Sequence, residues 1–531
     1  METGLRKKSV LWFALLIVAA LLRFAPIGSS LPYIDYVDEG YVLHQAIHLL
    51  NERTLDTGWY GYPSLPAYLT AGALIVAKPI YRQLHGHHFR NDLPPETSAQ
   101  TSTGYNYDLI SPPELILAGR IVAAVLSLAT VALAGAIGAA LRGRVAGVLA
   151  LMFTAVCPAL VLRASNVIVD TFATFFALLS LYFCERIRSN NGRVALNAVV
   201  AGLAAGLAFA SKYTAAAVFV AGLPIVWFRL ATIGVRFRLI GLALVGLLLG
   251  IGLGTPWTLL HWRAAMEHVS ETAANYWIIE SKPGYFGQAV AAAEVSWILA
   301  LGGSVGLIQM FREKSTRTTA LGWMLFAISL LAPFVGKPFQ PFRNLVPLVP
   351  LFCMAAAIAF AQLIDVTRGH RQARGFAIAT ALIGAAVVTC VVASFRPLQW
   401  RMTHRDSRVQ AIDWLLQHAA PGERILGVRE LAILPAEWKR LTANTTVVSW
   451  CETLDLVERE QFDYIVAGDY DLRNVPDFAV ASACLARWKE KTVSTTRVAE
   501  FGSGPTFIVP YLWHTNDERI VILRTSGPKS P

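Results

Sequence analysis

Charged side chains are scarce in this chain. They make up 15% of its 531 residues, whereas 55% of the residues are hydrophobic, and the mean hydropathy is +0.49. A soluble globular domain usually has about 25% charged residues, so this composition excludes an ordinary soluble enzyme. Apolar runs of roughly 18 or more residues recur, and each is long enough to cross about 30 Å of hydrocarbon. The sequence therefore predicts a protein with many membrane spans.

Cysteine is rare as well, with six residues, and it forms no metal-binding pattern. Neither a C-x-x-C nor an H-E-x-x-H spacing occurs, so neither motif predicts a zinc site. Cys451 and Cys484 lie in the polar C-terminal part, where an oxidising compartment would permit a disulfide. The other four are expected to pack as small apolar residues within or beside spans: Cys157, Cys184, Cys353 and Cys390.

Eleven apolar runs are expected to span the membrane. They cover residues 9–27, 116–140, 145–162, 167–184, 195–211, 213–229, 238–257, 289–310, 319–336, 344–363 and 375–395. With the N-terminus inside, alternate loops are cytoplasmic, and each of them is basic, as the positive-inside rule requires. These loops hold Arg142 and Arg144; Arg186, Arg188 and Arg193; Arg229, Arg236 and Arg238; Arg312, Lys314 and Arg317; Arg368, Arg371 and Arg374. The formal net charge of +11 thus indicates orientation rather than binding to nucleic acid.

The first apolar run resembles a signal peptide because three basic residues, at positions 6–8, precede it. The run is longer than a typical signal core, and Arg23, Phe24 and Pro26 stand where a small-residue cleavage site would be. We therefore expect a retained anchor with a cytoplasmic N-terminus.

Residues 62–80 are apolar enough to suggest a twelfth span. A span here would invert every later loop and break the charge pattern. The prolines and flanking aromatic residues of this segment suit short helices that lie at the membrane interface. We therefore expect residues 28–115 to form one long outer loop with interfacial helices.

From about residue 400 the composition becomes mixed and polar. Residues 410–418 have the pattern of an amphipathic helix, and a turn at Pro421-Gly422 follows. Strands are expected at 424–428, 445–449, 463–467, 506–509 and 519–523. The fold class is thus a polytopic α-helical membrane domain (1–399) followed by a small α/β domain (400–531), which the odd span count places outside.

Three acids follow the first span: Asp35, Asp38 and Glu39. Acids favour a helix N-terminus for structural reasons, which accounts for one of them but not for a cluster. Ionisable groups held at a membrane face usually serve chemistry or transport. Asp38 is the first candidate for a chemical role, followed by Glu39 and Asp35.

Further ionisable residues stand at predicted outer ends of spans. Asp170 begins the fourth span, where it either caps a helix or joins a site. Arg120, Lys212 and Arg343 lie at outer ends against the usual inward bias of basic residues. Snorkelling to lipid headgroups is one explanation, and binding of a phosphate group is the other.

Carboxylates and cations at a membrane surface suit the transfer of a sugar from a polyprenyl phosphate. A carboxylate can take the proton of an acceptor hydroxyl as its oxygen attacks the anomeric carbon. Basic groups, with or without a divalent metal ion, can stabilise the departing phosphate. A single displacement of this kind inverts the glycosidic bond.

Several short segments together resemble a known superfamily. They are Asp38-Glu39, the tyrosine- and proline-rich segment 60–68, Ala118-Gly119-Arg120, residues 202–214, residues 342–350 and residues 406–422. In this order they resemble the GT-C membrane glycosyltransferases, specifically the protein O-mannosyltransferase and aminoarabinose-transferase branch. Asn344 departs from the tyrosine that many relatives have there. The Trp-Trp-Asp signature of oligosaccharyltransferases is absent, so transfer of an oligosaccharide to asparagine is not expected.

The resemblance implies roles for particular residues. Asp38 would be the base, with Glu39 beside it and Asp170 in the place of a second active-site acid. The phosphate of the donor would face Arg343 and also Arg120 or Lys212. Tyr62 and Tyr68 would belong to a substrate loop. No cofactor follows from the resemblance with certainty, and a divalent metal ion is left open.

The combined prediction is an inverting glycosyltransferase in the inner membrane of a bacterium, acting on its outer face. Its partners would be a polyprenyl-phosphate-linked sugar and a lipid, protein or glycan acceptor. A flippase or other transporter is the alternative, and it would place charged residues deep within spans or show broken helices in matched halves. A non-catalytic scaffold is a third reading, and it leaves the cluster at Asp38 unexplained.

Overall fold

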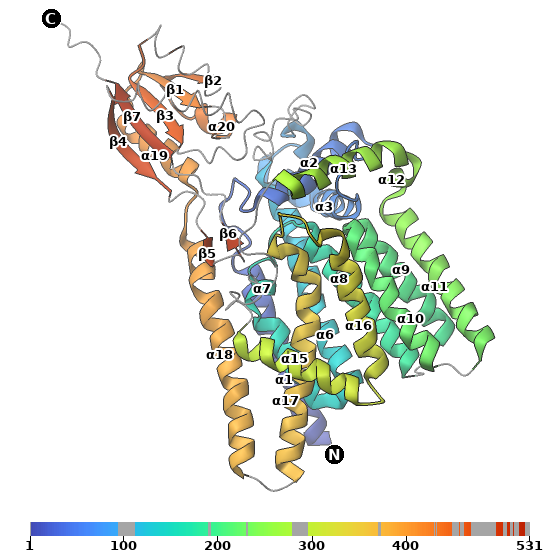
Figure 1. The fold of residues 1–531 in the computed structure, drawn as a ribbon. Coiled ribbons are helices and arrows are strands. Elements are labelled where there is room, and N and C mark those ends of the chain that lie inside the picture. The colour runs from blue at the N-terminus through green and yellow to red at the C-terminus, as the bar shows by residue number, and fades with distance from the viewer. Residues whose placement is uncertain are drawn as a thin grey trace, which may run out of the picture.

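The computed structural model describes residues 2–93, 112–189, 193–229, 232–278, 296–369, 373–428, 431, 433–448, 456, 461–468, 495–502, 507–509, 513–514 and 520–525. A long helical bundle carries a small sheet unit at the end opposite the N-terminus (Figure 1). Cys451 and Cys484, and the first residues of the predicted span 289–310, lie outside the described residues.

The bundle helices match the predicted apolar runs wherever these are described. They are α1 (Glu2–Phe24), α6 (Pro113–Val156), α7 (Pro158–Val161), α8 (Val169–Arg188), α9 (Val194–Ser211), η3 (Tyr213–Ala217), α10 (Val218–Arg229), α11 (Ile233–Gly254), α15 (Trp297–Arg312), α16 (Arg317–Leu331), η4 (Ala332–Phe334), η5 (Phe342–Leu348), α17 (Val349–Gly369) and α18 (Ala373–Thr403). Within the described residues, six helical segments are long and apolar enough to cross a membrane by themselves. The prediction of a polytopic helical membrane protein is confirmed.

Helix α6 contains two predicted spans that a break separates. Gly143 has a φ of 77°, a left-handed conformation that favours glycine, and Arg142 before it is also non-helical. The chain folds back at this break, so that the two halves of α6 pack against each other. A Cβ added at Gly138 would meet Ala150, and one added at Gly147 would meet Ala139. The prediction of a loop between residues 140 and 145 is therefore correct.

The predicted cytoplasmic loops meet one another. Arg142 forms an ion pair with Glu313. Arg188 donates hydrogen bonds to the carbonyl oxygens of Ser315 (2.9 Å) and Ala140 (3.1 Å). These contacts join three of the basic loops at one end of the bundle.

The short helices gather at the opposite end (Figure 1). They are α2 (Val37–Glu52), α3 (Leu65–Val76), α4 (Lys78–His85), η1 (Phe89–Asn91), α12 (Pro256–Leu260) and α13 (Trp262–Ile278). Helix α3 has 12 residues, and at about 1.5 Å per residue it is too short to cross a hydrocarbon layer of about 30 Å. The segment 62–80 is thus not a single spanning helix, as the charge pattern indicated.

The C-terminal unit contains α19 (Ser407–His418), α20 (Pro435–Trp438) and a five-stranded sheet of order β2-β1-β3-β7-β4. Strand β1 (Arg424–Val428) is parallel to β2 (Asn444–Val448) and β3 (Tyr464–Gly468), whereas β7 (Ile520–Thr525) is antiparallel to β3 and β4 (Thr495–Phe501). Strands β5 (Phe507–Val509) and β6 (Trp513–His514) form a separate pair. All five predicted strands coincide with observed ones over their described residues, and β4 and β6 were not predicted.

Candidate active site

The turn between α1 and α2 brings the three acids into separate surroundings. Asp35 is buried, and its carboxylate accepts hydrogen bonds from the hydroxyls of Ser29 (3.0 Å) and Ser30 (3.1 Å). Helix α2 begins directly afterwards, so Asp38 and Glu39 both lie in its first turn. There the backbone N–H groups have no helical partner and attract carboxylates.

Glu39 provides the cap. Its carboxylate accepts hydrogen bonds from the N–H groups of Asp35 (2.8 Å) and Tyr36 (3.3 Å), and from that of Val167 (3.0 Å). Arg120 binds the same carboxylate with two atoms, at 3.0 Å through Nε and 2.9 Å through Nη2. Both side chains are 0% exposed. The buried Glu39–Arg120 ion pair therefore connects the start of α2, the N-terminal part of α6 and the loop before α8.

Asp38 points to a different partner, because it forms an ion pair with Arg343 of η5. Its residue is 7% exposed. Burial raises the pKa of the Asp38 carboxyl above its ordinary value, and the charge of Asp170 raises it further. Arg343 and Lys212 oppose this rise. Asp38, Arg343, Asp170 and Lys212, from four segments of the chain, are thus close enough to interact electrostatically.

A second acid–cation pair stands beside the first. Asp170, in the first turn of α8, accepts a hydrogen bond of 2.6 Å from the ammonium group of Lys212. Lys212 follows the end of α9, and it also donates to the side-chain oxygen of Asn344 at 2.8 Å. Asn344 in turn donates to the hydroxyl of Tyr276 on α13 at 3.4 Å. Residues 343 and 344 therefore connect the two pairs.

Tyr62 of the tyrosine-rich segment lies near Asp38 and Arg343. Tyr62 lies with its ring centroid 5.3 Å from that of Tyr41 and 5.7 Å from that of Trp59. Burial and the neighbouring charge of Asp38 raise the pKa of the Tyr62 hydroxyl. Tyr68 points elsewhere, because its hydroxyl donates to the carbonyl oxygen of Leu55 at 2.5 Å.

The structure therefore divides the predicted site residues into two groups. Asp38, Asp170, Arg343 and Lys212 come together with Tyr62 near them, whereas Glu39 and Arg120 form a separate buried pair. Sequence reasoning did not assign roles to Asn344 or Tyr276. Asn344 was noted as a departure from the superfamily pattern, and that difference was the available signal.

The side chains at this site give little support for a bound metal ion. Among the described residues, no three His, Cys, Asp or Glu side chains are grouped so that they could hold one. The carboxylates of Asp38 and Asp170 each already have a cationic partner.

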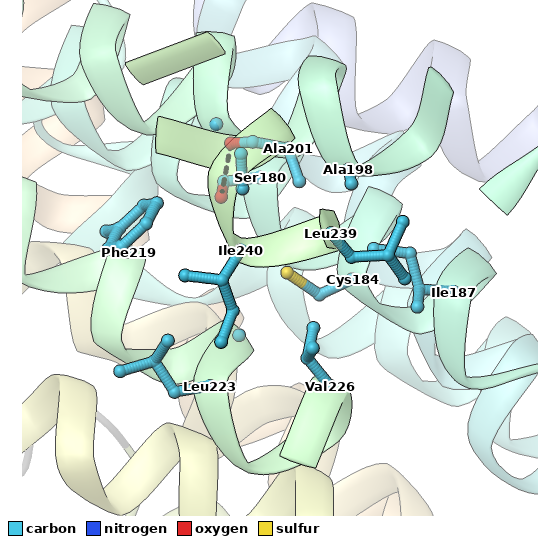
Figure 2. Close-up of a pocket in the computed structure, with 13 residues that line it drawn as sticks. Ser180, Cys184, Ile187, Ala198, Ala201, Phe219, Leu223, Val226, Leu239 and Ile240 are labelled. Carbon is cyan, nitrogen blue, oxygen red and sulfur yellow. Dashed lines mark hydrogen bonds between the residues drawn. The ribbon is translucent and has the colours of Figure 1, made fainter. Parts of the chain in front are cut away.

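An apolar pocket lies elsewhere, between α8, α9, α10 and α11 (Figure 2). Cys184, Leu239 and Ile240 are among its lining residues, and Ser180 on its wall donates to the carbonyl oxygen of Ala201 at 2.9 Å. Cys184 is 14 residues after Asp170 on α8, which places it about 21 Å along that helix. This pocket is not part of the charged site.

Comparison with known proteins gives a family match for one segment of the chain and a similar fold among solved structures. Residues 114–258 match the model of the dolichyl-phosphate-mannose-protein mannosyltransferase family. This segment contains Arg120, Asp170 and Lys212 but neither Asp38 nor Arg343. No match was found among curated proteins.

Solved structures of low sequence identity share the fold. The ArnT protein of Cupriavidus metallidurans bound to undecaprenyl phosphate is 15% identical and has a TM-score of 0.56, with 97% of each chain covered. The oligosaccharyltransferase of Archaeoglobus fulgidus tethered with an acceptor peptide is 12% identical and has a TM-score of 0.52, with 87% of this chain and 69% of that chain covered.

These similarities confirm the resemblance that the sequence motifs indicated. This multi-pass membrane protein has the GT-C fold of polyprenyl-phosphate-dependent glycosyltransferases, and its residues 114–258 match the protein mannosyltransferase family.

Proposed function

We propose that this protein is an inverting glycosyltransferase that moves a sugar from a polyprenyl phosphate to a hydroxyl acceptor at the outer face of the membrane. One observation carries the proposal. A buried carboxylate of raised pKa, Asp38, lies beside two cations, Arg343 and Lys212, at the end of the bundle opposite the N-terminus.

Asp38 acts as the general base. Its carboxylate takes the proton of the acceptor hydroxyl while the hydroxyl oxygen forms a bond to the anomeric carbon of the donor. The bond from that carbon to the phosphate oxygen breaks, and the polyprenyl phosphate leaves. A raised pKa makes the carboxylate a stronger base, which favours proton transfer near neutral pH.

Arg343 and Lys212 bind the phosphate of the donor. A bound phosphate competes with Asp38 for the guanidinium of Arg343, so donor binding releases the carboxylate for its role as base. Asp170 and Asn344 hold the ammonium group of Lys212 in place. Glu39 and Arg120, which sequence motifs associated with chemistry and with phosphate, serve as a frame that fixes the start of α2.

The solved relatives support the donor class. The ArnT protein of similar fold binds undecaprenyl phosphate. For the present chain, a lipid-linked sugar of this kind would keep its tail in the bilayer and its sugar at the charged site. The absent Trp-Trp-Asp signature favours a hydroxyl group of a lipid, protein or envelope glycan as the acceptor.

The same proposal includes an orientation. The N-terminus is cytoplasmic, eleven spans follow, and the first outer loop (28–115) and the C-terminal domain (400–531) lie outside a bacterial inner membrane. The mutual contacts of the basic loops at one end of the bundle support this arrangement. So does the gathering of the short helices and the sheet at the other end.

A panel of synthetic polyprenyl-phosphate sugars tests the function. The purified protein in liposomes is expected to release polyprenyl phosphate from at least one donor, with the sugar transferred to a hydroxyl acceptor in the inverted configuration. Movement of the intact donor across the bilayer without release would instead show a flippase. Retention of the anomeric configuration would exclude the single displacement.

A further inference from the structure

Two buried arginines of the C-terminal part hold the turn that leads to Asp38. Arg401 lies in the last turn of α18, and Arg408 lies in the first turn of α19. Both residues are at most 1% exposed. Each contacts residues more than 200 positions earlier in the chain, in the segments that lead to Asp38 and Asp170.

Arg401 joins two of these segments. Its guanidinium forms an ion pair of 2.7 Å with Asp35 and donates to the hydroxyl of Ser29 at 3.3 Å, both in the turn before α2. It also donates to the side-chain oxygen of Asn166 and the carbonyl oxygen of Leu162, each at 2.9 Å. The latter two residues precede α8, whose first turn contains Asp170.

Arg408 contacts the same turn through Tyr33. Its guanidinium carbon lies 3.8 Å from the centre of the Tyr33 ring, and Asp406 fixes the guanidinium through two contacts of 2.8 Å. The Tyr33 hydroxyl accepts a hydrogen bond of 3.2 Å from the N–H of Leu434. Tyr33 is therefore held between residues that belong to the C-terminal unit.

We propose that Arg401, at the end of α18 directly before the C-terminal unit, is a positioning residue that sets the place of Asp38 relative to Asp170. The link to Asp38 is short. Asp35 donates its backbone N–H to Glu39 (2.8 Å), so a shift of Asp35 alters the first turn of α2, where Asp38 lies. The inference rests on the proposed function only for its kinetic test.

Arg401→Lys is the test variant, because lysine keeps the positive charge but cannot reproduce the planar set of donors that reaches four partners. Arg23→Lys is the matched control. Arg23 is likewise buried and donates to Ser127 Oγ and to the carbonyl oxygens of Ala19, Ala155 and Thr154. None of these partners lies in the turn before α2 or in the loop before α8.

Hydrogen–deuterium exchange of the full-length protein gives the first readout. Arg401→Lys is expected to speed exchange in residues 33–39 and 162–168 by about tenfold or more, which corresponds to about 1.4 kcal/mol of lost protection. Arg23→Lys is expected to leave both segments at the wild-type rate. Wild-type exchange in Arg401→Lys, or equal acceleration in both variants, would overturn the proposal.

Kinetics gives the second readout. A misplacement of about 1 Å can cost about 100-fold in rate, so kcat of Arg401→Lys should fall by this order while KM for the donor stays near wild type. If the wild type is active and kcat of Arg401→Lys is unchanged, the proposal is contradicted. If the wild type transfers no sugar, the proposed function fails while the exchange experiment still decides the positioning role.

Asp35→Asn is the second variant in case Arg401→Lys does not fold. It removes the charge that faces Arg401 but keeps the shape of the side chain and an oxygen that can accept one of the two serine hydrogen bonds. The same acceleration in residues 33–39 and the same fall in kcat at constant KM are expected. Wild-type behaviour of a folded Asp35→Asn protein would overturn the inference.

Discussion

Two adjacent acids have different roles because neighbouring side chains on a helix point about 100° apart. Glu39 turns toward the free N–H groups at the start of α2 and toward Arg120. Asp38 turns toward Arg343 and the charges of the second pair. The same dipeptide thus supplies a structural cap and the proposed base, so either explanation alone is incomplete.

The raised pKa of Asp38 predicts how activity depends on pH. The base must be deprotonated, so the acidic limb of the kcat/KM profile should lie above the ordinary aspartate value of about 3.9. The charge of Asp170 raises the pKa of Asp38, whereas Arg343 lowers it. Asp170→Asn should therefore move the limb to lower pH, and Arg343→Gln should move it to higher pH.

Both variants are expected to be slower, so the position of the limb, not the rate, is the result that matters. Asp413→Asn on α19 is the control. The Asp413 carboxylate pairs with Arg405 and Arg440, away from the site. The acidic limb of the Asp413→Asn profile should therefore lie at the same pH as that of the wild type. Shifts of the two site variants in the same direction would mean that Asp38 is not the group that titrates.

Sequence reasoning singled out the charged residues Asp38, Asp170, Arg343 and Lys212 by their position near predicted outer ends of spans. It could not pair them, because the partners lie far apart in the chain. Glu39 and Arg120 are 81 residues apart, and Asp38 and Arg343 are 305 apart. Which cation meets which acid depends on how the helices pack, and no local pattern carries that information.

At the scale of elements, the close packing of α9 against α11 positions Lys212, which follows the last residue of α9. Glycines make this approach feasible. A Cβ at Gly202 would overlap the carbonyl oxygen of Ala243, and one at Gly246 would overlap that of Val199. Such contacts between backbones are characteristic of membrane helices with small residues at their interface.

Gly246→Ala should therefore destabilise the bundle by about 1–3 kcal/mol, the usual cost of overpacking. Gly252→Ala on the same helix is the matched control, because a Cβ there has nothing within 4 Å. Thermal unfolding in detergent should show a lower Tm for Gly246→Ala only. Equal Tm values for the two variants would show that the α9–α11 contact is looser than the structure indicates.

Element prediction succeeded where one local signal dominated. The break at Gly143, between the runs 116–140 and 145–162, followed from hydropathy and basic residues. Strand β4 was missed because it is a sheet edge, with exposed residues such as Arg497 and Glu500 and no apolar run. Strand β6 has only two residues, Trp513 and His514, and gives no periodic pattern.

At the scale of the whole molecule, the charged site, the short helices and the sheet unit share one end, and the basic loops share the other. The proposed chemistry requires that the first of these ends faces the compartment where the acceptor lies. The C-terminal unit also contacts the turn before Asp38, because Arg408 packs on the Tyr33 ring and Leu434 donates its N–H to the Tyr33 hydroxyl. Sequence composition indicated the separate unit but not this connection.

Asp38→Asn, assayed in right-side-out membrane vesicles with an acceptor that cannot cross the bilayer, tests the central claim most directly. The variant should bind polyprenyl phosphate at least as well as wild type, because Arg343 loses its competing partner. Single-turnover transfer should fall by roughly 100- to 10,000-fold, the usual contribution of a general base. Asp413→Asn should transfer at the wild-type rate. Transfer by Asp38→Asn at the wild-type rate would contradict the role of this carboxylate.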